Sequence, residues 1–259
     1  MSLDWLIIGG GIHGVHIAAR LIGDAGVNSE GLRIVDPGEK LLSCWHNSTA
    51  ITGMTYLRSS SVQHLDLCPR SLRNFAGKRK RRKTELFAYP NDRPSLRLFN
   101  AHCDHVLEQY GLNELHIRDK AIRCSLDCDS VSVQLAGGTE IHTQNLVLAI
   151  GVGEQPAWPD WAPRGETRVQ HVFDPELAEC SSDREKVIVI GGGISAGQVA
   201  LRLVDEGHEV HLVSRHALRK HQYDSDPGWL GPKHMVKFSR ERDFDRRRSM
   251  IAKARYRGS

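Results

Sequence analysis

The sequence predicts an α/β fold in which two Rossmann-like dinucleotide-binding units follow one another. A short apolar strand, a glycine-rich turn and an apolar helix occur in this order near the N-terminus, and the same order returns in the last third of the chain. A length of 259 residues allows one large domain or two modest ones. The repeat therefore favours two nucleotide sites in one chain.

The first unit opens with the buried strand Asp4–Ile8, and its glycine turn leads directly into the apolar helical stretch Val15–Leu21. In G-x-G-x-x-G the first glycine permits a tight turn, the second lets a pyrophosphate approach, and the third lets the helix pack on the strand. Free N–H groups at the start of the helix then face the phosphates. The residues expected there are Gly9, Gly11, Ile12, His13 and Gly14.

The acid after the second strand favours an FAD-like first site. Strand Leu32–Val35 ends in Asp36, where a carboxylate is expected to bind the hydroxyls of the adenosine ribose.

The second unit repeats the pattern with a different ending. Strand Val187–Ile190 leads into a turn and the helical stretch Val199–Val204. The next strand, Glu209–Val213, ends in Ser214 and Arg215, and an arginine at this place suits the 2′-phosphate of NADPH. The alternative is a surface arginine at a strand end. The residues expected at this nucleotide are Gly191, Gly193, Ile194, Ser195, Ala196, Ser214 and Arg215.

Composition points to a protein of the cytoplasm. Hydrophobic content is 40% and charged content 25%, which is ordinary for a globular chain. Because the first strand begins at residue 3 or 4, we expect no signal peptide, and no apolar run reaches the length of a membrane span. The six cysteines are scattered like reduced thiols and include no C-x-x-C pair: Cys44, Cys68, Cys103, Cys124, Cys128 and Cys180.

One basic run, Lys78–Lys83, resembles a nucleic-acid patch or a localisation signal. It lacks interleaved aromatic residues, so we favour a solvated loop and do not expect nucleic acid as a partner. His102 and His105 share a face of the helix expected at Pro94–Gln109, but no third ligand accompanies them, and we expect no metal site.

The segment after Asp36 resembles the flavin-dependent lysine and ornithine N-hydroxylases. Cys44-Trp45-His46 and Met54-Thr55-Tyr56-Leu57-Arg58 are similar to a Trp-His pair and a Met-x-x-Leu-Gln segment that lie beside the flavin in that family. The resemblance implies that Trp45 and His46 line the flavin. Arg58 stands where the family has Gln, and Ile194 and Gln198 depart from its second motif.

A three-stranded β insert is expected before the last parallel strand, as in glutathione-reductase-like FAD domains. Its strands are Leu115–Ile117, Ala121–Leu126 and Val131–Leu135, with Gly137-Gly138 as a hairpin turn before Thr139–His142. Strand Asn145–Ile150 then reaches Gly151, and Ala149-Ile150-Gly151 with Pro156 resembles the A-T-G-x-x-x-x-P signature of that superfamily. We place an FAD-binding domain at residues 1–160 and an NAD(P)H-binding domain at residues 161–259.

The two sites predict an oxidoreductase that uses FAD and NADPH. A disulfide reductase would need a C-x-x-C pair, and an oxidase with one nucleotide motif would not need the second unit. We therefore expect a monooxygenase that activates O₂ and hydroxylates an amine or a similar nucleophile. The sequence names no acid, base or nucleophile for this step. The alternatives are a non-catalytic or redox-sensing dinucleotide-binding protein and, last, a nucleic-acid binder.

The second unit is short for its class. Only two clear strands precede the charged helical stretch Phe238–Arg255, and a parallel sheet without its inner strands leaves apolar faces uncovered. We therefore expect a shortened form of a longer monooxygenase-like protein, which holds FAD weakly and pairs with another chain, such as a second copy.

Overall fold

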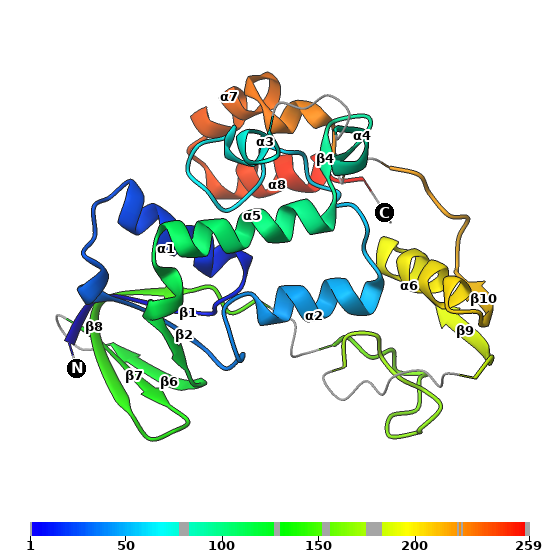
Figure 1. The fold of residues 1–259 in the computed structure, drawn as a ribbon, viewed down its shortest axis with the longest axis horizontal. Helices are drawn as coiled ribbons and strands as arrows, with labels where there is room; N and C mark the ends of the chain where they lie inside the picture. Colours follow the sequence, from blue (N-terminus) through cyan, green and yellow to red (C-terminus); the bar gives the residue numbers. More distant parts are fainter. Residues whose placement is uncertain are drawn as a thin grey trace. The chain divides into compact units, whose positions relative to one another are not determined.

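The computed structural model describes residues 2–77, 83–126, 130–151, 156–174, 183–221, 223 and 225–256. The basic residues Lys78–Arg82, Cys128 and Cys180 lie outside these ranges. The chain divides into two compact units, residues 1–178 and 179–259. Figure 1 shows the helices and strands that belong to each. The domain boundary near residue 160 stays a prediction.

The first unit is built on one six-stranded sheet of order β5-β2-β1-β8-β7-β6. Strands β5, β2, β1 and β8 run parallel, while β6 and β7 join antiparallel at one edge. The strands are β1 (Ser2–Ile8), β2 (Leu32–Asp36), β5 (His116–Arg118), β6 (Ala121–Leu126), β7 (Val131–Leu135) and β8 (Glu140–Leu148). The parallel arrangement confirms the predicted Rossmann-like α/β class.

Two strand predictions near the insert were wrong. The stretch at 115–117 does not belong to the insert: β5 pairs in parallel with β2, from Ile34 with His116 to Asp36 with Arg118. The two strands predicted at 139–142 and 145–150 form the single strand β8. This is possible because the first part of β8 pairs with β7 while the rest pairs with β1, so one strand belongs to both the antiparallel and the parallel parts.

The two faces of this sheet carry separate cores because strand side chains alternate between faces. Ile7 and Ile34 point to the helical face, whereas Leu6, Ile8 and Val35 join the opposite cluster. That second cluster is completed by apolar side chains of β7 and β8: Val131, Val133, Leu135 and Ile141. Side chains of the antiparallel strands β7 and β8 therefore pack against the face of β1 and β2 that the helices leave free.

Helices α1 (Ile12–Gly23) and α5 (Leu96–Gln109) supply the other face. Helix α5 begins where Ser95 caps it, since the Ser95 hydroxyl accepts a hydrogen bond of 3.3 Å from the Leu98 N–H. Its apolar side chains recur every three or four residues and are buried along one side. The remaining elements are η1 (Ser29–Gly31), α2 (Ser43–Thr52), α3 (Ser71–Phe75), α4 (Lys83–Leu86), β3 (Phe87–Ala88), β4 (Arg93–Pro94) and η3 (Leu112–Leu115).

The second unit has a smaller sheet, in which β9 (Lys186–Ile190) pairs in parallel with β10 (Glu209–Val213). Helix α6 (Ile194–Asp205) connects the two strands, and it buries Val199, Ala200 and Leu203. One face of the sheet stays open, because Ile188 and Ile190 are 64% and 58% exposed.

The charged helix predicted at 238–255 is two helices. After η4 (Pro227–Leu230), α7 spans Pro232–Arg240 and α8 spans Phe244–Ala254. The break has a local cause, because the Asp243 carboxylate accepts a hydrogen bond of 2.9 Å from the Arg246 N–H and so caps a new helix. Across the described ranges, none of the helices has the length and apolarity needed to cross a bilayer.

A fully buried histidine joins α3 and α5. His102 is 0% exposed, and its Nε2 lies 2.9 Å from the Ser71 hydroxyl, while its Nδ1 has no hydrogen-bond partner among the described residues. Its ring lies 5.0 Å from that of His64 and 5.5 Å from that of Phe75. Burial, and then the neighbouring His64, lowers the pKa of His102 to about 4.

We expect His102 to make the fold sensitive to acid. The unfolded histidine titrates at about 6.5, so the unfolded state binds more protons between that pH and about 4, and stability is lost as the pH falls through this window. The loss from His102 alone should be on the order of 3 kcal/mol. Urea unfolding of the wild type and of His102→Gln between pH 7 and 4 measures it. The control is His142→Gln, an exposed histidine of β8; an equal pH dependence in all three proteins would contradict the prediction.

Candidate functional site

The first glycine turn lies between the end of β1 and the start of α1. Gly9 has φ +109°, a conformation that glycine adopts readily, and a Cβ there would lie 2.4 Å from the Ala149 carbonyl oxygen. A Cβ on Gly14 would lie 1.8 Å from the Gly9 carbonyl oxygen, whereas one on Gly11 would meet nothing within 4 Å. The outer glycines are therefore required for packing, and Gly11 faces open space that a phosphate can occupy.

The helix end beside this space is free to bind an anion. Gly11 is the N-cap of α1, and no side chain caps the helix. The first intrahelical bond of this turn runs from the Val15 N–H to the Gly11 carbonyl, at 3.0 Å. The N–H groups of Ile12 and His13 precede that bond, at the positive end of the helix dipole. The geometry fits the pyrophosphate of a dinucleotide.

Asp36 has a role in addition to the one predicted for it. One carboxylate oxygen accepts a hydrogen bond of 2.7 Å from the Gly10 N–H, and the other accepts one of 2.8 Å from the Gly38 N–H. Asp36 thus fixes the glycine turn to the end of β2. Each carboxylate oxygen keeps a further lone pair, so the predicted contact with a ribose hydroxyl is compatible with both bonds.

Two leucines that the sequence reasoning missed complete the turn. The Leu42 N–H donates a hydrogen bond of 2.8 Å to the Gly10 carbonyl, and Leu42 has φ +66°. The Leu41 side chain contacts Gly10 so closely that a Cβ there would lie 2.7 Å from it. A buried leucine in a left-handed conformation costs about 1–3 kcal/mol and persists only where its surroundings require it. No sequence signal marks this position.

Gly151 follows β8 close to the same turn. The Ala149 N–H donates to the Ile8 carbonyl at 2.8 Å, so the end of β8 stays beside the end of β1. Gly151 has φ +60°, which explains a glycine there. Its predicted contact with the cofactor stays a prediction.

The second glycine turn repeats the first in detail. The Gly191 N–H donates to the Val213 carbonyl at 2.9 Å, as the Gly9 N–H does to the Val35 carbonyl at 2.8 Å. Gly193 is the N-cap of α6, again without a side-chain cap, and α6 has 12 residues like α1. Ile194, Ser195 and Ala196 form the first turn of α6. A second helix end without a side-chain cap is therefore present, and its geometry also fits a phosphate.

The segment after β10 carries the residues predicted for NADPH. The Ser214 hydroxyl donates to the His216 carbonyl, and a Cβ on Gly192 would lie 3.1 Å from the His216 ring. The sequence reasoning missed this histidine. Arg215 is exposed and forms no ion pair with any described residue. A free guanidinium at this strand end fits a 2′-phosphate.

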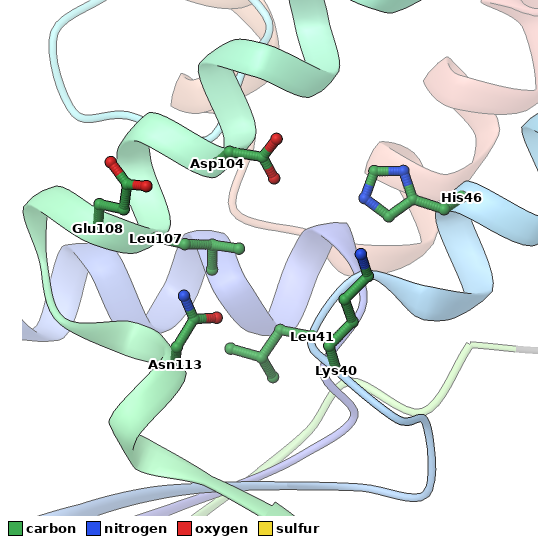
Figure 2. Close-up of a pocket in the computed structure, with 7 residues that line it drawn as sticks. All are labelled: Lys40, Leu41, His46, Asp104, Leu107, Glu108 and Asn113. Carbon is green, nitrogen blue, oxygen red and sulfur yellow. The ribbon is translucent and has the colours of Figure 1, made fainter.

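Trp45 and His46 point to different surroundings. The Trp45 indole N–H donates to the Asn100 side-chain oxygen at 2.9 Å, and its ring lies 5.4 Å from that of Phe99. These contacts hold α2 against α5. His46 instead lines a pocket of about 260 Å³ (Figure 2). The contact of both residues with a flavin stays a prediction.

The pocket brings together four elements of the first unit. Lys40 and Leu41 come from the loop after β2, His46 from α2, Asp104, Leu107 and Glu108 from α5, and Asn113 from η3. Figure 2 shows Asp104 and Glu108 on one side and Lys40 and His46 on the other. Among the described residues, those of the pocket included, no group of three or more His, Cys, Asp or Glu side chains is placed to hold a metal ion.

The surroundings of Gly14 and Gly11 predict different effects of an alanine substitution on stability. Gly14→Ala puts a methyl group against the Gly9 carbonyl and should reduce the free energy of unfolding by about 3 kcal/mol. Gly11→Ala has room and a negative φ of −77°, so its unfolding free energy should stay near that of the wild type. Urea unfolding of the ligand-free proteins distinguishes them. Equal losses would show that the contact at Gly14 is relaxed in solution.

Similar folds occur in solved structures of flavin enzymes. A double mutant of a flavin monooxygenase from Stenotrophomonas maltophilia matches with a TM-score of 0.58 and 17% identity, over 84% of this chain and 59% of that one. A bacillithiol disulfide reductase from Bacillus cereus matches with a TM-score of 0.57 and 20% identity, over 93% of this chain and 66% of that one. A cyclohexanone monooxygenase from Rhodococcus sp. Phi1, bound to NADP⁺, matches with a TM-score of 0.55 and 17% identity, over 83% of this chain and 38% of that one. This chain thus spans less than two thirds of each of them.

The sequence itself shows the family. No curated protein matches it significantly. The profile described as pyridine nucleotide-disulphide oxidoreductase matches residues 6–243, which include both glycine turns. This is a family of flavin- and NAD(P)-dependent oxidoreductases, so the predicted FAD and NADP cofactors are confirmed for the family. The narrower likeness to the N-hydroxylases stays a prediction. The chain belongs to the pyridine nucleotide-disulphide oxidoreductase family.

Proposed function

We propose that this chain binds FAD and NADPH and supports a monooxygenase-like oxidation of a small amine or similar nucleophile. The observation that carries the proposal is the pair of glycine turns with the same backbone hydrogen bonds and uncapped helix ends. Two dinucleotides in one chain suit electron transfer between them. The flavin and NADP-bound monooxygenases among the similar structures support this class.

In this proposal the first unit holds FAD. The open space at Gly11 and the N–H groups of Ile12 and His13 receive the pyrophosphate, and Asp36 binds the adenosine ribose. FAD held there would supply the redox chemistry, the transfer of two electrons from NADPH to O₂. The residues of this chain orient the cofactor and keep water from it, and we assign none of them a proton transfer. We place this domain at residues 1–160.

The second unit, proposed at residues 161–259, holds NADPH. The N–H groups at the start of α6 receive its pyrophosphate, and Arg215 pairs with its 2′-phosphate. The overall reaction balances as NADPH, a proton, O₂ and an amine giving NADP⁺, a hydroxylamine and water. One oxygen atom enters the amine, and the other leaves as water.

Thiol-disulfide exchange is disfavoured by the described cysteines. Burial, and then the neighbouring Asp104, raises the pKa of the Cys103 thiol to about 12, so it stays protonated. Cys44, Cys68 and Cys124 are exposed on three separate segments, α2, the loop before α3, and β6. The likeness to a bacillithiol disulfide reductase therefore supports the fold and not that reaction.

The proposal predicts that Gly11→Val loses flavin without unfolding. A branched side chain at Gly11 projects into the space meant for the pyrophosphate, and its Cβ has no protein atom within 4 Å. Purified wild type reconstituted with FAD should show the visible flavin spectrum and NADPH-dependent oxygen consumption, and Gly11→Val should show neither while keeping its circular dichroism. Flavin without oxygen consumption would favour a redox-sensing role. Equal flavin content in both proteins would refute the assignment of the first site.

The role of Arg215 is tested by cofactor preference. Arg215→Gln removes a charge-assisted contact worth on the order of 1.5–3 kcal/mol, so NADPH should bind roughly ten-fold more weakly or worse, while NADH is nearly unaffected. Calorimetric titration with both nucleotides measures this. Lys220→Gln, an exposed cation of the same segment, serves as the control. An equal loss of affinity for NADPH and NADH would mean that Arg215 stabilises the loop and does not bind the 2′-phosphate.

A further inference from the structure

The pocket on the helical side of the first unit has charges of opposite sign on its two sides. Asp104 and Glu108 lie one turn apart on α5 and therefore on the same face of that helix. Lys40 and His46 enter from the loop after β2 and from α2 (Figure 2). The pocket is thus acidic where α5 forms its wall, and cationic or hydrogen-bond donating on the opposite wall.

These charged side chains do not neutralise one another. Other surface ions in the described residues do pair, as Arg20 does with Asp24 at 2.5 Å and Arg73 with Asp92 at 2.5 Å. The side chains of Lys40, Asp104 and Glu108 form no ion pair or side-chain hydrogen bond with any described residue. The pocket therefore keeps opposite charges apart with space between them.

We propose that this pocket binds a small zwitterion, a molecule with one ammonium and one carboxylate group such as a free amino acid. Its ammonium group lies between Asp104 and Glu108, and its carboxylate receives hydrogen bonds from Lys40 and from an imidazole N–H of His46. A molecule with separated charges satisfies both walls at once, whereas a simple amine or a simple carboxylate satisfies only one. The inference goes beyond the proposed function and does not depend on it.

Size and lining restrict the ligand further. A volume of about 260 Å³ lies below the roughly 300–1,000 Å³ of pockets for drug-sized ligands, so it suits an amino acid and excludes a dinucleotide. The apolar side chains of Leu41 and Leu107 are buried at the pocket and offer contact to the ligand's methylene groups. Two carboxylates on one wall also repel a phosphate. The chemistry therefore points to a zwitterion and away from a second nucleotide.

The pocket also adjoins the first glycine turn through one side chain. Leu41 lines the pocket and, at the same time, packs against Gly10. Gly10 is in turn bonded to Asp36. A ligand in the pocket thus lies one side chain away from the proposed flavin phosphate site, but outside it.

The test is calorimetric titration of the full chain without added flavin. The probes are the free amino acids, 4-aminobutyrate and 6-aminohexanoate, compared with butylamine and butyrate. At least one zwitterion should bind, and the one-charge analogues should bind roughly ten-fold more weakly or worse. Asp104→Asn and Lys40→Gln, which keep shape but remove charge, should each weaken the zwitterion by a similar factor.

Matched controls separate the pocket from general surface charge. Glu114→Gln on η3 and Arg97→Gln on α5 remove exposed charges from the same elements outside the pocket, and binding should persist in both. The inference is overturned if no zwitterion binds, if the one-charge analogues bind equally well, or if the pocket variants bind like the controls. Because the readout needs neither FAD nor turnover, a failure here leaves the proposed oxidoreductase function unaffected, and the reverse also holds.

Discussion

The contact between the Gly9 carbonyl and the Cα of Gly14 determines how closely α1 can approach β1. Because a side chain at Gly14 would clash with that carbonyl, the distance between strand and helix depends on the absence of a single methyl group. Asp36 and Leu42 then hold Gly10 from two sides by hydrogen bonds to its N–H and its carbonyl. The turn is thereby fixed before any ligand arrives, and Gly11 is left facing open space. Preorganisation of this kind lowers the entropic cost of binding a phosphate.

The same principle appears in the second unit with different support. The Gly191 N–H keeps the backbone bond to the end of β10, but Ser214 and His216 stand beside Gly192 where Asp36 and Leu41 stand beside Gly10. A carboxylate is replaced by a hydroxyl and a neighbouring guanidinium, and under the proposed function this replacement changes the expected ligand group from a ribose hydroxyl to a 2′-phosphate. The proposal thus uses one backbone arrangement for two nucleotides, with the residues after the second strand of each unit distinguishing between them.

Much of this could be predicted from sequence because it depends on local patterns. The strand, glycine turn and helix are confirmed in both units, and Asp36 and Arg215 lie at or just after strand ends as predicted, while their contacts with the nucleotides stay predictions. The pairing of β5 with β2 and the fusion of two expected strands into β8 could not be read, because they are set by partners distant in the sequence. The break before α8 has a sequence signal, the helix-capping residue Asp243, but this residue lies within a run of charged residues and was not recognised as a cap.

The pocket was not predictable from the sequence, since its walls come from four segments that only the folded structure brings together. Leu42 could not be foreseen either, because its backbone conformation is imposed by Gly10.

Ala196 stands in the second turn where the first has Gly14. Ala196 already carries a methyl group, whereas a methyl group on Gly14 would lie 1.8 Å from the Gly9 carbonyl oxygen, so α6 accommodates a side chain that α1 cannot accept. The two turns thus have the same hydrogen bonds but differ in how tightly helix and strand are pressed together. Recognition rules that require three glycines will detect the first turn and overlook the second.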